Sequence, residues 1–154
     1  MPEIFWEDLV EGEVKTSLPY TVTRDEILDF ARNYDPQPMH LSEAAGKASM
    51  LGGLAASGWH TCSIMMRLLF DSLLARAAGL GSPGIEETRW SEPVFPEDVV
   101  HLRRTVTETR SSKSRPDRGL VTFKLELVKA KGSVACEIIC VVIFARRNPG
   151  ARLA

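Results

Sequence analysis

Residues 58–78 read GWHTCSIMMRLLFDSLLARAA, a segment that is apolar around nearly its whole circumference when it is drawn as a helix. Only Arg67, Asp71 and Arg76 carry charge in this segment, and the first two stand four positions apart. A helix that is apolar on every side must be buried on most of them. Because three charges at mid-span argue against a membrane span, we expect one long helix that other parts of the chain wrap.

The second half of the chain contains the strands that would form this wrapping. Residues 121–127 alternate between apolar and polar side chains, which is the period of a half-buried strand. Residues 99–109 alternate less cleanly. Residues 134–146 become apolar on both faces from Ile138 onward, which favours a central strand covered on two sides. Lys131-Gly132 predicts the hairpin turn between the last two strands.

The first half of the chain contains one strand candidate and shorter helices. Residues 14–20 alternate like a strand, and Pro19 marks its end or a sheet edge. Thr23 and Glu26 form a capping-box pattern that opens a helix, and Asp35-Pro36 ends it. After a loop over residues 35–40, Ser42 can cap a short helical turn. Early helices and late strands predict an α+β fold, an antiparallel sheet curled around one buried helix, whose free edge a partner subunit could cover.

The bulk composition limits the classes of protein to consider. The 154 residues, 44% hydrophobic and 25% charged, suit a single globular domain over residues 1–154, with 148–154 as a loose tail. A net charge of −1 provides no general attraction for nucleic acid or a membrane. The three cysteines lack the spacing of a disulfide framework, and the sequence shows no secretory signal. Both observations favour the cytoplasm. No metal-ligand spacing or nucleotide-binding glycine loop is present, so we expect no metal and no bound cofactor.

Asp35 and His40 are the first candidates for chemistry. They lie five positions apart across a loop that Pro36 and Pro38 stiffen. A carboxylate and an imidazole can hold one water molecule between them and share the transfer of its protons. Alternatively, an Asp after a helix is a common turn residue and a single His is often only packed, so this pair alone leaves both interpretations open.

Gly58, at the start of the apolar helix, is the second candidate. Its backbone N–H would lie at the positive end of the helix dipole, where a thioester carbonyl oxygen could be held as it gains charge. Ser57 and Gly58 also suit purely structural roles, as the helix N-cap and as a site of close packing. The two interpretations are compatible.

The residues from Asp35 to His40, followed by Ala56-Ser57-Gly58 at the opening of the helix, resemble the signature of the MaoC-like dehydratases and (R)-specific enoyl-CoA hydratases. The usual form is Asp-x-Asn-Pro-x-His, then His-Gly at the start of the central helix of a hot-dog fold. Residues 86–100 resemble the strand and turn that follow in this family. The resemblance implies a hot-dog fold, with Asp35 and His40 as the catalytic pair and the Gly58 N–H as oxyanion donor.

The resemblance also implies an activity, a hydro-lyase that adds or removes water at the double bond of a 2-enoyl or 3-hydroxyacyl thioester of coenzyme A or acyl carrier protein. It implies a homodimer with the site near the interface, and substrate contacts from Gln37, Pro38 and Ser57. The chain departs from the pattern at Gln37, where Asn is usual, at Ser57, where His is usual, and at Glu97, where a turn usually has Gly. A hot-dog thioesterase and a non-catalytic subunit that binds acyl thioesters are the alternatives.

Other polar residues have weaker claims to function. A basic run over residues 110–118 could meet the phosphates of coenzyme A or form a solvated loop. We expect His60 to pack against the core, and His101 has no evident partner in its strand. Cys136 and Cys140 share one face of a predicted strand and are expected to behave as small buried hydrophobic residues. The basic run consists of Arg110, Lys113, Arg115 and Arg118.

Overall fold

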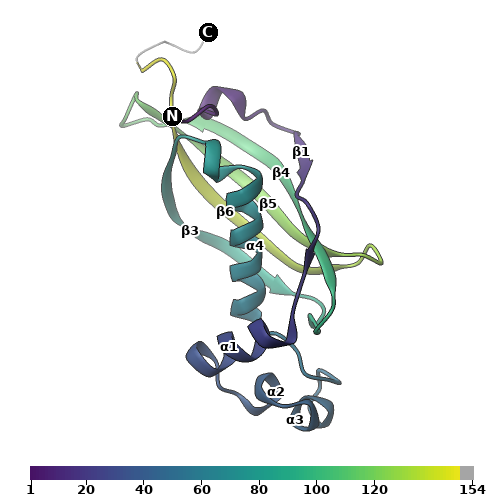
Figure 1. Ribbon diagram of the computed structural model, residues 1–154. Helices are drawn as coiled ribbons and strands as arrows, with labels where there is room; N and C mark the ends of the chain where they lie inside the picture. The colour runs from purple at the N-terminus through teal and green to yellow at the C-terminus, as the bar shows by residue number, and fades with distance from the viewer. Residues whose placement is uncertain (150–154) are drawn as a thin grey trace.

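The structure, a computed structural model, describes residues 1–149, in which a long antiparallel sheet curls around helix α4 (Figure 1). This is the α+β arrangement that the sequence pattern predicts. The elements, in chain order, are η1 (Trp6–Asp8), β1 (Val14–Thr16), β2 (Tyr20–Thr21), α1 (Arg24–Tyr34), α2 (Pro38–Leu41), α3 (Glu43–Ala48), α4 (Gly58–Ser72), η2 (Leu74–Arg76), β3 (Gly79–Trp90), β4 (Val99–Ser111), β5 (Arg118–Lys129) and β6 (Val134–Ala145).

The sheet has the strand order β1-β4-β5-β6-β3, and β2 pairs with β4 beside β1. Every pairing is antiparallel. The three predicted late strands are present as β4, β5 and β6; β4 and β5 are longer than expected, and β6 ends one residue earlier than expected, at Ala145. Gly132 has φ +93 in the turn between β5 and β6, a conformation that favours glycine, so the predicted hairpin turn is confirmed.

The core lies between α4 and the concave face of the sheet. Met65 and Leu69 of α4 are at most 3% exposed, and Phe123 and Phe144 of β5 and β6 pack edge to face beneath the helix with ring centroids 6.2 Å apart. Burial of each side chain of this size contributes about 1.5–3 kcal/mol relative to exposure. The wrapping of α4 by the late strands therefore supplies most of the core.

Helix α4 is shorter than predicted, because it ends at Ser72 and not near Ala78. Leu73 leaves the helix with φ −144 and ψ −60, and a 3-10 turn follows. The carbonyl oxygen of Arg76 accepts hydrogen bonds from the N–H groups of Glu3 and Ile4, at 2.8 and 3.1 Å. The Arg76 carbonyl is therefore bonded to the N-terminal segment and not to a further turn of α4.

Helix α4 is also less completely buried than its composition predicts. One face leaves Trp59, Met66 and Phe70 exposed by 60%, 52% and 47%. This face borders strand β3, where Leu80 and Ile85 are exposed by 50% and 54%. The apolar excess of α4 therefore forms a surface stripe instead of a second contact within this chain.

Two predictions from the first half of the chain were wrong. The expected strand over residues 14–20 is two short strands at the edge of the sheet, and Leu18 between them is 84% exposed because α4 does not reach this edge. Part of the loop expected at residues 35–40 is helix α2, which starts with Pro38 at a position where its missing N–H has no cost. The expected tail at 148–154 is described only to residue 149, and residues 150–154 lie outside the described part.

Helices α1, α2 and α3 gather at the N-terminal end of α4, at the opposite end of the molecule from the N-terminus (Figure 1). The capping box of α1 is present, since Thr23 Oγ1 accepts from the Glu26 N–H and the Glu26 carboxylate accepts from the Thr23 N–H. Gly46 of α3 lies directly against the backbone of Gly53 and Leu54, and any side chain there would overlap it. Within the described residues, no helix is both long enough and apolar enough to cross a membrane.

Candidate active site

The end of α4 nearest α1 borders a cavity of about 400 Å³ that collects the predicted site residues. Asp35, Gln37, His40 and Gly58 all line it. Its other walls come from α2, the loop before α4 and the segment after β3. These further lining residues are Met39, Met50, Leu51, Ala56, Trp59, Thr61, Trp90, Ser91, Glu92, Pro93 and Val94. Pro38 and Ser57, predicted to bind substrate, are not among the lining residues.

Asp35 is the C-cap residue of α1, and two neighbouring side chains hold its carboxylate. Ser57 Oγ donates to Oδ2 at 2.6 Å, and the Gln37 amide donates to Oδ1 at 2.8 Å. The Ser57 hydrogen bond is the main cause that lowers the pKa of Asp35 below its usual value; burial opposes it, while Gln37 and the charge of His40 act in the same direction as Ser57. The carboxylate is therefore ionised at neutral pH and is a hydrogen-bond acceptor.

His40 lies on α2 and is only 5% exposed. Its Nδ1 is 2.8 Å from the carbonyl oxygen of Ala55. A carbonyl only accepts, so Nδ1 carries a hydrogen, and in the neutral ring Nε2 is then an acceptor. Nε2 faces Asp35 Oδ2 at 3.6 Å, beyond a good direct hydrogen bond. In the neutral ring both atoms are acceptors and do not bond each other, so each can accept a hydrogen bond from a water molecule in the cavity.

Ser57 and Gly58 begin helix α4. The Ser57 hydroxyl accepts from the Trp59 N–H at 3.3 Å while it donates to Asp35, so one side chain joins the helix cap to the carboxylate. Ser57 is 1% exposed, and both functions of its hydroxyl are occupied by the protein. The N–H of Gly58, the first helical residue, has no acceptor among residues 1–149 and lies at the positive end of the helix.

Trp90 explains why position 58 is glycine. A Cβ on Gly58 would lie 2.8 Å from the Trp90 ring, closer than side chains approach one another. The Trp90 indole N–H donates to the Gly58 carbonyl at 2.9 Å, and the ring meets Trp59 edge to face at 5.4 Å. The aromatic pair therefore fixes the first turn of α4.

His60 is not part of this cavity, although it lies only two positions beyond Gly58. Its ring stacks on Phe30 at 4.9 Å, and Nε2 is 3.4 Å from the Glu26 carboxylate. Glu26 also accepts from the Tyr20 hydroxyl at 3.0 Å. Burial is the main cause that lowers the pKa of His60, and the Glu26 carboxylate opposes it. The expected packing role of His60 is thus observed, as a link between α1 and α4.

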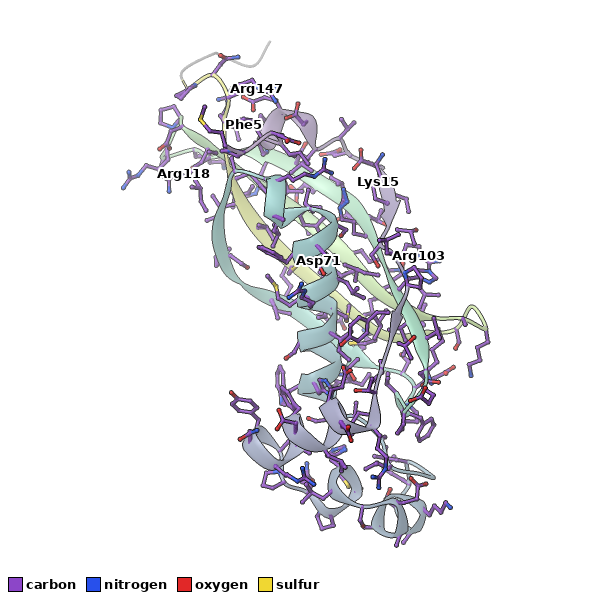
Figure 2. The ribbon with its side chains drawn as sticks, viewed as in Figure 1. Phe5, Lys15, Asp71, Arg103, Arg118 and Arg147 are labelled. Atoms are coloured by element: carbon purple, nitrogen blue, oxygen red, sulfur yellow. The ribbon has the colours of Figure 1, made fainter. Side chains whose placement is uncertain are left out.

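The basic run of residues 110–118 lies far from the cavity. It occupies the end of β4, the connection to β5 and the start of β5, and Figure 2 shows Arg118 at the end of the sheet opposite to α1, α2 and α3. Arg118 Nε is also paired with Asp117 Oδ1 at 2.9 Å. Within one copy of the chain, this run lies at the other end of the sheet from the cavity and contributes no lining residue to it.

Sequence patterns missed part of the site. The Ala55 carbonyl that orients His40 is a backbone group, and no pattern of side chains in the sequence predicts its position. Trp59 and Trp90 come together from α4 and β3, and Met50 lies on the short segment after α3. The described residues contain no cluster of three or more His, Cys, Asp or Glu side chains that could hold a metal ion.

A family model described as a MaoC like domain matches residues 7–127. A MaoC-like dehydratase from Rhodospirillum rubrum is 40% identical in sequence, with 95% of this chain and 99% of that one covered and a TM-score of 0.85. A monoamine oxidase regulatory protein from Archaeoglobus fulgidus is 25% identical, with 96% and 98% covered and a TM-score of 0.85.

An (R)-hydratase from Pseudomonas aeruginosa, 16% identical with 98% and 94% of the chains covered, has a TM-score of 0.72 and supports the fold alone. The structural matches confirm the α+β hot-dog fold, with the sheet wrapped around α4. The family model spans well over half of the sequence. This chain therefore belongs to the MaoC-like family.

Proposed function

We propose that this protein adds water to, or removes water from, the α,β double bond of an acyl thioester carried by coenzyme A or acyl carrier protein. The observation that carries the proposal is the pair of acceptors in the cavity, Asp35 Oδ2 and His40 Nε2, at 3.6 Å. Gly58 offers a free helix N-terminal N–H in the same cavity. Membership of the MaoC-like family supports a hydro-lyase in general terms.

In the hydration direction, a water molecule held between Asp35 and His40 attacks the β-carbon of the enoyl group. One proton of this water passes to the pair, and the pair delivers one proton to the α-carbon, so that it returns to its starting state. In between, the thioester oxygen carries the negative charge of an enolate. The Gly58 N–H donates to this oxygen, and the positive end of α4 stabilises its charge. Dehydration follows the same steps in reverse.

The roles of Gln37 and Ser57 in this proposal are to hold Asp35. Their hydrogen bonds occupy one lone pair on each carboxylate oxygen and orient the group towards His40. The departures from the family pattern at these two positions are therefore compatible with catalysis, because Gln37 and Ser57 both donate to the carboxylate. Pro38 acts indirectly, as the first residue of the helix that carries His40.

We also infer that the active form is a dimer of two copies of this chain. β3 ends the strand order and pairs only with β6 among the described strands, so its other edge is free. The exposed apolar residues beside this edge form a β3–α4 patch, made of Trp59, Met66, Phe70, Leu80, Ile85 and Trp90. Trp59 and Trp90 also line the cavity, so a copy docked on this patch would close the site.

The first experiment mixes the purified protein with crotonyl-CoA and follows loss of the enoyl absorbance and release of free thiol together. We expect enoyl loss without thiol release. Asp35→Asn and His40→Ala should each lower kcat by roughly 100-fold or more, the scale of general acid–base catalysis. Thiol release would identify a thioesterase instead. Binding without either signal would identify a subunit that holds acyl thioesters without turning them over.

A further inference from the structure

A second cavity, which the proposed reaction does not use, lies between α4 and the β3–β6 half of the sheet. Its volume is about 390 Å³, and its walls are almost entirely apolar, with Met65 and Leu69 from α4 and Ile138 and Cys140 from β6. Well-packed cores contain few voids larger than a water molecule. A volume within the range of roughly 300–1000 Å³ is typical of a small-molecule pocket.

This apolar cavity exists because the residues of β3 that line it between positions 79 and 82 are small. Gly79, Gly81 and Ser82 line it, and the pairing of β3 with β6 shifts register on both sides of Gly81. Gly81 has φ +121, which a residue with a side chain rarely adopts. The cavity is thus set by the backbone of β3 and not by chance rotamers.

Trp90 is the last residue of β3, the strand that runs from the apolar cavity, which Ile85 lines, to the catalytic cavity. It lines the catalytic cavity, and its indole N–H donates to the carbonyl of Gly58, one helical turn before Cys62, which lines the apolar cavity. The indole is held in place by its hydrogen bond to the Gly58 carbonyl and by Trp59. A thioester oxygen bound to the Gly58 N–H would therefore place the start of the acyl chain beside this ring.

We propose that Trp90 restricts the substrate to short acyl groups by closing the way from the catalytic cavity into the apolar cavity. This inference rests on the proposed function and names its substrate class. A longer chain must either bend away from the apolar cavity, and so lose the burial of its extra methylenes there, or displace an indole that two contacts hold. Replacing Trp90 by a small residue joins the two cavities and gives a long chain an apolar site.

The test compares kcat/KM for crotonyl-CoA and decenoyl-CoA. The wild type should prefer crotonyl-CoA, and Trp90→Ala should raise the ratio of decenoyl to crotonyl by roughly tenfold or more, the discrimination that a few methylenes provide. Trp90→Leu should act in the same direction with less loss of packing. Trp59→Ala removes one of the two contacts that hold the Trp90 indole and should raise the ratio by less than Trp90→Ala does. An unchanged ratio in both Trp90 variants would overturn the proposal.

Filling the apolar cavity supplies the complementary measurement. Alone, Cys140→Phe should leave the ratio of kcat/KM for decenoyl-CoA to that for crotonyl-CoA unchanged. Combined with Trp90→Ala, it should abolish the increase in this ratio that Trp90→Ala causes. If Cys140→Phe alone lowers decenoyl-CoA turnover, the wild type already uses this cavity and Trp90 is not a barrier. Calorimetric binding of butyryl-CoA and decanoyl-CoA to the same variants separates the two proposals. A Trp90-dependent shift in binding without turnover supports the barrier and refutes the hydratase, whereas turnover without a shift refutes only the barrier.

Discussion

A single hydroxyl group, that of Ser57, connects the start of α4 to the carboxylate of Asp35 at 2.6 Å. In Ser57→Ala the pKa of Asp35 should rise, because this hydrogen bond is the main cause that lowers it. Asp35 works as an ionised acceptor, so activity increases as pH rises through its pKa, and the acidic limb of the kcat profile should move to higher pH. We expect kcat at neutral pH to fall roughly tenfold, the scale of one hydrogen bond to a charged group.

Ser57→Thr is the matched control, because it keeps the hydroxyl and should keep the acidic limb where it is in the wild type. A profile that moves equally in both variants would mean that Ser57 acts through packing. The measurement is the pH dependence of kcat with saturating crotonyl-CoA.

Glu97 is the one non-glycine residue among those described with a positive φ, +68. It lies in the turn where the sequence comparison with the family pattern expects Gly, and its side chain is exposed. The left-handed conformation disfavours a residue with a Cβ by about 1–2 kcal/mol. Glu97→Gly should therefore raise the free energy of unfolding by about 0.5–1 kcal/mol, part of the gain being lost to the greater freedom of Gly in the unfolded chain.

Thermal and denaturant unfolding of Glu97→Gly and Glu97→Ala test this prediction. The Ala variant keeps the strain and should show no gain. Equal stabilisation by both variants would assign the effect to the removed charge instead of the backbone.

At the level of residues, the sequence predicts positions better than contacts. Asp35, His40 and Gly58 meet in one cavity because the loop and helix spacing place them there. Ser57 and Gln37 look like departures from a pattern, and only the folded chain reveals that both donate to Asp35. Such contacts depend on where α1 and α4 cross, which no local pattern encodes.

Among the elements, the strands with clear alternation were predictable, and β3 was predictable only from Glu86 onward. Its first half contains Gly79, Gly81, Pro83 and Gly84, a composition typical of a loop. This segment becomes a strand because β6 pairs with it, and the register shifts allow for its irregular residues. Tertiary pairing therefore overrides local propensity.

The contact between α1 and α4 provides a pH-dependent part of stability. Burial lowers the pKa of His60, so the unfolded chain binds a proton at this residue more readily than the folded chain. Stability should therefore fall as pH decreases below about 6.5, the ordinary pKa of His. The slope cannot exceed about 1.4 kcal/mol per pH unit for one proton.

His60→Phe keeps the stack on Phe30 and removes the titration, so it should flatten this slope between about pH 6.5 and pH 4.5, the range above the ordinary pKa of carboxylates. Ser63→Ala, a change at an exposed position of α4 that removes no titratable group, is the control and should leave the slope as in the wild type. Urea unfolding across the pH range measures both. A slope that persists in His60→Phe would place its origin elsewhere in the molecule.

For the whole molecule, the two edges of the sheet differ. The β1 edge carries two exposed apolar residues, Val14 in β1 and Leu18 after it, whereas the β3 edge adjoins the β3–α4 patch of six exposed apolar residues. A few exposed apolar residues are ordinary, but a larger cluster beside a free strand edge is typical of an interface. The sequence indicates this interface only indirectly, because α4 has more apolar side chains than the strands that wrap it can bury.

Two lysine side chains placed on the β3–α4 patch should therefore dissociate the dimer into single chains. In Phe70→Lys/Leu80→Lys, burial of two ammonium groups at the interface would be unfavourable, and light scattering should show the mass of one chain where the wild type has the mass of two. Neither residue lines either cavity. Activity should nevertheless fall roughly tenfold or more, because Trp59 and Trp90 lose their cover and the site admits water. Leu18→Lys, at the other edge, should change neither mass nor activity. A wild-type monomer with full activity would refute the dimer and leave the chemistry of Asp35 and His40 intact.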